Sequence, residues 1–123
     1  MQVQSLSLAA ILLVPLASPA WAHHSHGAYV AGPNATHLEG TVKEVQLINP
    51  HSWIYLEVKN EKGVAVEWEV EMMSLNHLRG YGWTSKTVKP GDTISCTGSP
   101  AKSGAPSMIS NRMKLADGRD IRS

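Results

Sequence analysis

The chain has 123 residues, 42% of them hydrophobic and 17% charged, and this length suits a single domain. With 11 Lys and Arg against 10 Asp and Glu, the formal charge is only +1. The composition therefore excludes a large multidomain enzyme, the strongly basic surface that nucleic-acid binding needs and the acidic excess typical of disordered tails.

Residues 1–22 have the pattern of a secretory signal peptide. A mostly apolar run over residues 6–16, too short to cross a bilayer, leads to the A-x-A pattern of Ala20-Trp21-Ala22. We therefore expect export to the periplasm or out of the cell, with cleavage after Ala20 or Ala22 and no membrane span in the mature chain. The alternative is a retained N-terminal anchor, because the first residues carry no Lys or Arg.

Residues 23–36 are short of large apolar side chains and rich in Gly, Ala and Pro, which predicts a flexible, His-containing arm. We expect the folded domain to span residues 37–123. Its first segment, residues 38–47, alternates apolar and polar side chains, and the alternation shifts phase near Lys43 and Glu44. This pattern predicts a long strand with a bulge.

A hairpin is expected next. Residues 52–59 alternate so that Trp53 and Tyr55 lie on the face opposite the presumed core, and residues 60–63 form the turn. The third strand, residues 64–72, has apolar side chains on one face, while its other face is acidic and solvent-exposed, with Glu67, Glu69 and Glu71.

The remaining segments predict one short helix and two strands. Ser74 is placed to cap a helix that ends at Gly80. A fourth strand ends at Thr97, and a fifth covers residues 108–115. Three strands, a helix and two strands is the order of a small OB-like five-stranded barrel, so we predict an all-β fold of this kind with its helix between strands 3 and 4.

The sulfur-containing residues are expected in the core. Cys96 is the only cysteine and cannot form an internal disulfide, so the predicted barrel depends on its apolar packing. Met72 and Met73 are neighbours on a strand and face opposite ways, which opposes a paired Cu(I) site. Met108 and Met113 are interpreted as core residues.

Three imidazoles, His23, His24 and His26, follow the predicted cleavage point. A cut after Ala22 makes the α-amino group and the His23 ring one chelating residue, and the earlier cut makes His23 the third residue of a square-planar site. Both cuts favour Cu(II) or a similar ion as the cofactor. The alternative is a His-rich tail that binds metals adventitiously.

A fourth imidazole is expected at the rim of the barrel. Asn49 and Pro50 form the turn that presents His51 before the second strand, where the arm could fold back to it. His51 is therefore a predicted metal ligand, and its alternative role is a hydrogen bond at the rim. His37 and His77 are predicted to be surface residues.

Trp53 and Tyr55, together with Asn49, are candidate ligand-binding residues. OB-folds bind ligands on the face formed by strands 2 and 3, and an exposed aromatic pair can stack on a ligand. The acidic side chains on the neighbouring strand argue against nucleic acid. The alternative is that the arm or the last loop buries both aromatic rings.

Several short motifs follow one another along the mature chain: His23-His24-Ser25, Gly40-Thr41-Val42, Asn49-Pro50-His51-Ser52-Trp53-Ile54, Trp68-Glu69-Val70-Glu71, Gly82-Trp83-Thr84, Lys89-Pro90-Gly91-Asp92, Gly98-Ser99-Pro100-Ala101-Lys102 and Leu115-Ala116-Asp117-Gly118. In this order they resemble a family of small exported bacterial proteins known only as a domain of unknown function. The resemblance implies a periplasmic barrel with no established activity. A weaker similarity is to small periplasmic OB-like copper chaperones.

The sequence thus predicts a non-enzymatic periplasmic protein that binds a copper-like metal with His23, His24, His51 and His26. The alternative hypothesis is a module without metal that binds a protein or a small organic ligand on the Trp53–Tyr55 face. The expected partners are accordingly a metal ion or a periplasmic protein, and the sequence contains no P-loop, Rossmann glycine pattern or G-x-S-x-G motif.

Overall fold

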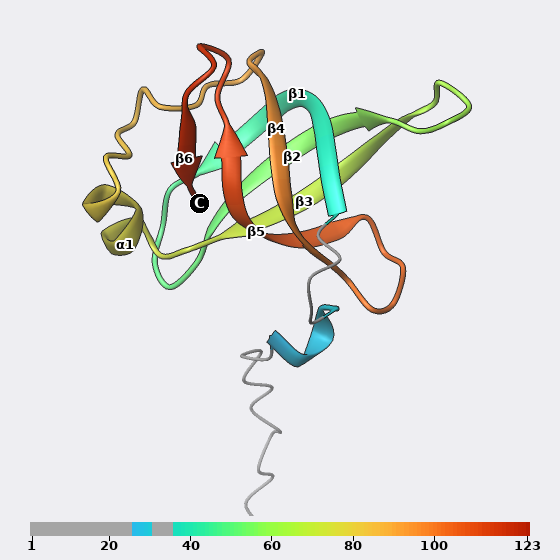
Figure 1. Ribbon diagram of the computed structural model, residues 1–123, viewed down its shortest axis with the longest axis horizontal. Helices are drawn as coiled ribbons and strands as arrows, with labels where there is room; N and C mark the ends of the chain where they lie inside the picture. Colours follow the sequence, from blue (N-terminus) through green and yellow to red (C-terminus); the bar gives the residue numbers. More distant parts are fainter. Residues whose placement is uncertain (1–25, 31–35) are drawn as a thin grey trace, which may run out of the picture.

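The computed structural model describes residues 26–30 and 36–123, and the predicted signal peptide lies outside these ranges. Figure 1 shows the elements, which follow the chain as η1 (His26–Ala28), β1 (Thr36–Gln46), β2 (Ser52–Lys59), β3 (Ala65–Met72), α1 (Leu75–Gly80), β4 (Thr93–Pro100), β5 (Ser107–Lys114) and β6 (Asp120–Arg122). In the part of the chain described, no helix has the length and apolar character needed to cross a membrane.

The strands form one sheet that closes on itself. Their order is β3-β2-β1-β4-β5-β6, and a parallel pairing of β3 with β5 completes a five-stranded barrel. All the other pairings are antiparallel. The predicted OB-like barrel with a short helix between β3 and β4 is confirmed. The short strand β6, which extends the sheet beyond β5, is an addition to the prediction.

Strand β1 belongs to both halves of the barrel wall. Its first half pairs with β4 and its second half with β2, and the register shifts between Val42 and Glu44, where the sequence predicts a bulge.

Two glycines allow strands to approach closely. A Cβ atom at Gly40 would collide with the carbonyl oxygen of Glu57, and one at Gly98 would collide with that of Ile109.

The core fills the inside of the barrel with apolar side chains from every strand of the closed wall. Cys96, Met108 and Met113 are among the buried residues, as predicted. Burial raises the pKa of the Cys96 thiol to about 12, because the apolar interior disfavours the thiolate. The central members of the core are Val42, Ile54, Leu56, Val70, Met72, Ile94, Cys96, Met108 and Met113.

Helix α1 covers one end of the barrel. The Ser74 hydroxyl accepts a hydrogen bond from the backbone N–H of His77, so the predicted cap is confirmed. Leu78 anchors the helix by burying its whole side chain in the core. Trp83, in the following loop, is also buried, and its indole N–H donates to the carbonyl oxygen of Arg122 at 2.6 Å.

Candidate functional site

The turn that carries His51 is held in place from two sides. The peptide bond between Asn49 and Pro50 is cis. Within the turn, the Ser52 hydroxyl donates to the carbonyl oxygen of Ile48 and accepts from its N–H. The Asn49 side-chain oxygen accepts from a backbone N–H at the start of α1, which ties the turn to the helix. Neighbouring elements therefore fix the position of the imidazole at the barrel rim.

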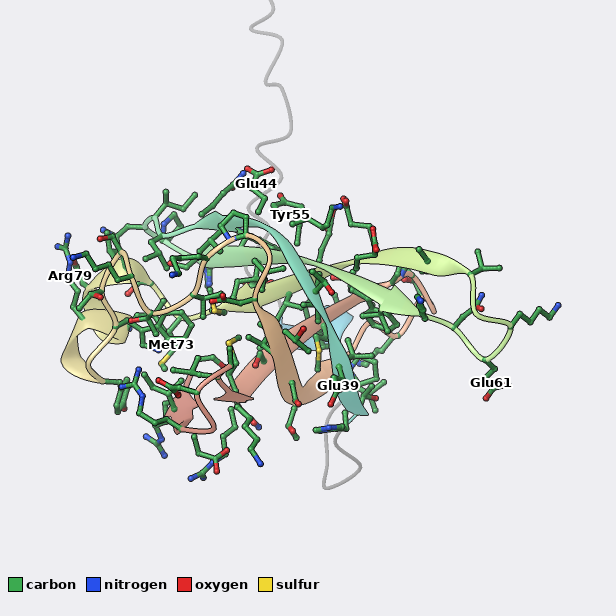
Figure 2. The ribbon with its side chains drawn as sticks, turned by 90° about the horizontal axis from the view of Figure 1, so that it is seen from above. Glu39, Glu44, Tyr55, Glu61, Met73 and Arg79 are labelled. Carbon is green, nitrogen blue, oxygen red and sulfur yellow. The ribbon has the colours of Figure 1, made fainter. Side chains whose placement is uncertain are left out.

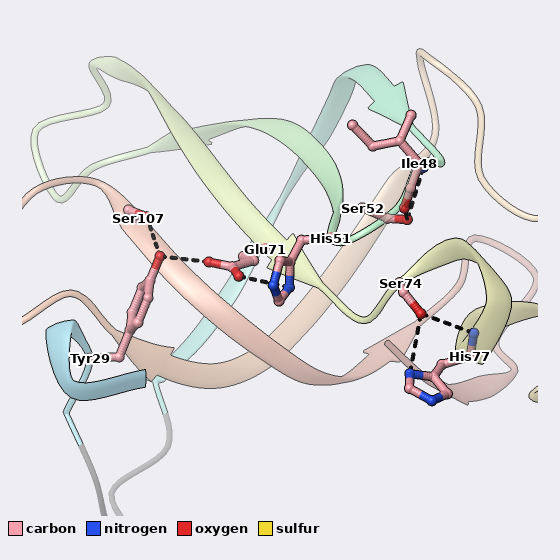
Figure 3. Close-up of polar contacts among 8 residues, drawn as sticks. All are labelled: Tyr29, Ile48, His51, Ser52, Glu71, Ser74, His77 and Ser107. Carbon is pink, nitrogen blue, oxygen red and sulfur yellow. Dashed lines mark hydrogen bonds and ion pairs between the residues drawn. The ribbon is translucent and has the colours of Figure 1, made fainter. Parts of the chain in front are cut away.

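His51 contacts the carboxylate of Glu71, the outward-facing residue near the end of β3 (Figure 3). Its Nδ1 lies 3.1 Å from Oε1 of Glu71. The Glu71 side chain is only 15% exposed and the His51 side chain 34%. A carboxylate so far removed from water needs hydrogen-bond donors, and the imidazole supplies one.

The second oxygen of Glu71 binds the arm. The Tyr29 hydroxyl donates to Oε2 of Glu71 at 3.0 Å and lies 3.4 Å from the hydroxyl oxygen of Ser107 on β5. Partial burial raises the pKa of the Tyr29 hydroxyl, and the negative charge of Glu71 adds to this rise, while the Ser107 contact opposes it. The tyrosine therefore stays protonated and can act as a donor.

Backbone contacts hold the same segment of the arm against the β4–β5 connection. Tyr29 forms an isolated bridge with Ala101. The N–H of Val30 donates to the carbonyl oxygen of Pro100, and the N–H of Lys102 donates to that of Ala28, both at 2.9 Å. Residues 28–30 thus pair with the end of β4 and the start of the β4–β5 connection, and Figure 1 shows η1 just below the barrel.

A pocket of about 290 Å³ opens next to His51. The rim turn and Glu71 form one side of it, and Ser74 and His77 of the α1 region form another. Met73, which is partly buried, adds a thioether to the lining. The Ser74 hydroxyl oxygen lies 3.2 Å from Nδ1 of His77. The pocket is therefore lined by two histidines and two methionines, Met72 and Met73, beside the shared carboxylate.

The predicted metal ligands are only partly described. His23 and His24 lie outside the described residues, and His26 contributes its backbone to the start of η1. Within residues 26–30 and 36–123, no group of three or more His, Cys, Asp or Glu side chains is arranged to hold a metal ion. His51 has a carboxylate beside it, whereas the exposed His37 contacts a threonine hydroxyl on β4.

The Trp53–Tyr55 face lies on the outside of the wall formed by β1, β2 and β3. Both aromatic residues are partly exposed. Trp53 is paired with Glu71, and Tyr55 stands between Glu44 and Glu69 in the register. Figure 2 shows Glu44 and Tyr55 next to each other on this outer surface. Asn49 lies in the rim turn, where its side chain binds α1.

Glu71 and Tyr29 complete the site but are absent from the sequence prediction. The alternation of β3 predicts Glu71 to be solvent-exposed like Glu67 and Glu69, but its side chain is only 15% exposed because it lies between the rim turn and the arm. The β2–β3 register could have predicted that Glu71 lies near His51. Counting back from the hairpin turn pairs Glu71 with Trp53, two residues after His51. Tyr29 gives no such signal, because it reaches the site through contacts between segments far apart in the chain.

Comparison with known proteins places the chain in a family without assigning it an activity. No curated protein matches it. The model of a family of unknown function, DUF6152, matches residues 10–110, which cover most of the chain and reach into β5. The chain therefore belongs to this family of unknown function.

Proposed function

We propose that the protein is a non-enzymatic accessory protein that binds Cu(II) or a similar metal ion outside the cytoplasm. The ligands would be His23, His24, His26 and His51. The observation that carries the proposal is that Tyr29 of the arm and His51 of the barrel rim bind the same carboxylate, that of Glu71. This contact attaches the arm beside the imidazole of the barrel.

Chain geometry keeps the other imidazoles near this point of attachment. A fully extended chain spans at most about 3.5 Å per residue, so the Cα atom of His24 lies no more than about 18 Å from that of Tyr29. His26 is closer still along the chain. An arm tethered at Tyr29 therefore gives its histidines a high local concentration at the rim, as a flexible linker does for a joined ligand.

The contact between His51 and Glu71 matches the way that proteins orient metal-binding histidines. A carboxylate that accepts the Nδ1 proton selects the tautomer in which Nε2 carries the lone pair, and it makes the imidazole a better ligand. Several imidazoles with a terminal amine suit the tetragonal nitrogen geometry of Cu(II). Glu71 would orient His51 in this site without being a ligand itself.

The first experiment determines the mature terminus and then its affinity for Cu(II). The intact mass of the exported protein distinguishes cleavage after Ala20 from cleavage after Ala22. Calorimetric titration with Cu(II) then compares this protein with one that carries an additional N-terminal residue. We expect the additional residue to weaken Cu(II) binding by about tenfold or more, because it removes the terminal amine from the chelate.

The second comparison tests the contribution of the barrel. We expect His51→Gln to weaken Cu(II) binding about tenfold, with His37→Gln as the matched control, because His37 is an exposed imidazole elsewhere on the same wall. Equal, weak binding by the native and extended termini would overturn the proposal. Equal affinities of His51→Gln and His37→Gln for Cu(II) would mean that the barrel contributes no ligand and that the arm binds metal as an ordinary His-rich tail does.

A further inference from the structure

A second surface of the barrel combines aromatic rings with carboxylates, and it does not depend on the proposed metal function. We call it the acidic aromatic face and define it by five residues on the outside of β1, β2 and β3: Glu44, Trp53, Tyr55, Glu67 and Glu69. The register places Glu44, Tyr55 and Glu69 in one row across the three strands. Neighbouring strands are about 4.8 Å apart, so a carboxylate flanks the tyrosine on each side.

Three carboxylates of this face, those of Glu44, Glu67 and Glu69, are not part of an ion pair in the described part of the chain. A neighbouring ion pair joins Lys43 to Glu57, which lies opposite Glu67 on β2. All three of these carboxylates are exposed. Glu44 accepts a hydrogen bond from the side chain of Gln46, which leaves its charge in place.

The negative charge of this face affects the pKa of Tyr55. The pKa of the Tyr55 hydroxyl is raised, first by its partial burial and then by the negative charges of Glu69, Glu44 and Glu67 in that order. Charges on β1 and β3, the two strands on either side of β2, therefore act together at one ring. A cation placed over that ring would gain from the carboxylates and from the electron-rich aromatic face at the same time.

We propose that the acidic aromatic face docks a basic segment of another protein, one that presents Lys and Arg side chains. Small organic molecules bind in concave sites, whereas this face is the outer wall of a barrel. Glu67 and Glu69 are two residues apart on one strand, which separates their side chains by about 7 Å. Alternate side chains of an extended basic segment repeat at the same distance, and Arg also stacks on aromatic rings.

The test measures the binding of a short fluorescent peptide that has Arg and Lys at alternate positions. A second peptide with Gln at those positions serves as its neutral counterpart. We expect the basic peptide alone to bind, with an affinity that falls as salt is added. The triple variant Glu44→Gln, Glu67→Gln, Glu69→Gln should bind it about tenfold more weakly, and Tyr55→Leu about threefold.

The matched control carries the same charge change elsewhere. Glu39, Glu61 and Asp120 are exposed, and Figure 2 shows the first two away from Tyr55. Their replacement by Gln, Gln and Asn should change the affinity less than twofold. An equal loss in both triple variants would overturn the proposal, because it would mean attraction by overall charge alone.

Two further outcomes would also overturn it. One is the absence of peptide binding by the unmodified protein, and the other is equally tight binding of arginine amide, which would indicate a small-cation site. Amide chemical shifts of the unmodified protein provide a check that needs no variant. They should move on β2 and β3 when the basic peptide is added, and Cu(II) affinity should be the same in the face variant as in the unmodified protein.

Discussion

The two oxygens of the Glu71 carboxylate contact different residues: Oε1 contacts His51 on the rim, and Oε2 accepts a hydrogen bond from Tyr29 on the arm. A hydrogen bond to a charged group contributes more than a neutral one, typically about 1.5–3 kcal/mol, because the ion would otherwise be poorly solvated. The Tyr29 hydroxyl is therefore a strong polar attachment of the arm, and we expect the backbone bonds at Val30 and Lys102 to open more often without it.

Replacing Tyr29 with Phe tests this dependence. We expect the amides of Val30 and Lys102 to exchange with solvent about tenfold faster, because one hydrogen bond to a charged group, of about 1.5 kcal/mol, no longer opposes local opening. Hydrogen exchange measured by NMR gives the rates. Tyr81→Phe is the control, because it removes another surface hydroxyl, one that accepts from Arg122. Unchanged exchange at Val30 would show that the backbone bonds alone hold the arm.

At the scale of elements, two glycines determine where the wall can bend and close. Gly98 lies at the register shift between β4 and β5, where a side chain would overlap the backbone of Ile109. Gly40 has the same role where β1 passes from β4 to β2. Backbone atoms cannot move aside as a flexible side chain can, so these positions tolerate no Cβ without a shift of a whole strand.

The corresponding prediction concerns Gly98→Ala. We expect it to lower the free energy of unfolding by about 2–4 kcal/mol, because the added methyl group forces β4 and β5 apart. Gly80→Ala at the end of α1 is the control, since a Cβ atom there meets nothing within 4 Å. Urea denaturation followed by Trp fluorescence measures both. A Gly98 variant as stable as the control would contradict the close approach.

Strands with a clear local alternation can be predicted from the sequence. The pairings that close the barrel are harder to predict. Alternation and a turn at residues 60–63 are enough to predict β2, β3 and the face on which Trp53 lies, because the side-chain period of a strand is fixed. The parallel pairing of β3 with β5 and the edge strand β6 join segments with no local signal. For the same reason His51 is recognisable as a candidate while its contact with Tyr29 is not.

At the scale of the whole molecule, the barrel holds its one thiol in a fully apolar interior. Cys96 is completely buried, with a pKa near 12 against an ordinary value of 9.0. Because the folded state binds the thiol proton more tightly than the unfolded state does, the contribution of Cys96 to stability is complete below pH 9. It is lost progressively as the pH rises from there towards 12.

This linkage gives a measurable pH dependence. Between pH 7 and pH 10 we expect the unmodified protein to lose about 1.4 kcal/mol more stability than Cys96→Ala, which has no thiol to ionise. Comparing the two chains cancels the titration of the tyrosines and lysines that they share. Urea denaturation at both pH values provides the four free energies. Parallel losses in the two proteins would mean that the thiolate is already tolerated in the folded core.

The double pairing of β1 has a consequence for the order of folding. The β2–β3 hairpin joins residues close in sequence, whereas β1 meets β4 through pairs as distant as Thr36 and Gly98. Loop-closure entropy makes the distant pairing late, and the hairpin is expected to form early. Glu71 and its neighbour His51 belong to that early unit. The docking of Tyr29 on Ser107 requires the finished barrel, so the attachment of the arm is a natural reporter of the last step of folding.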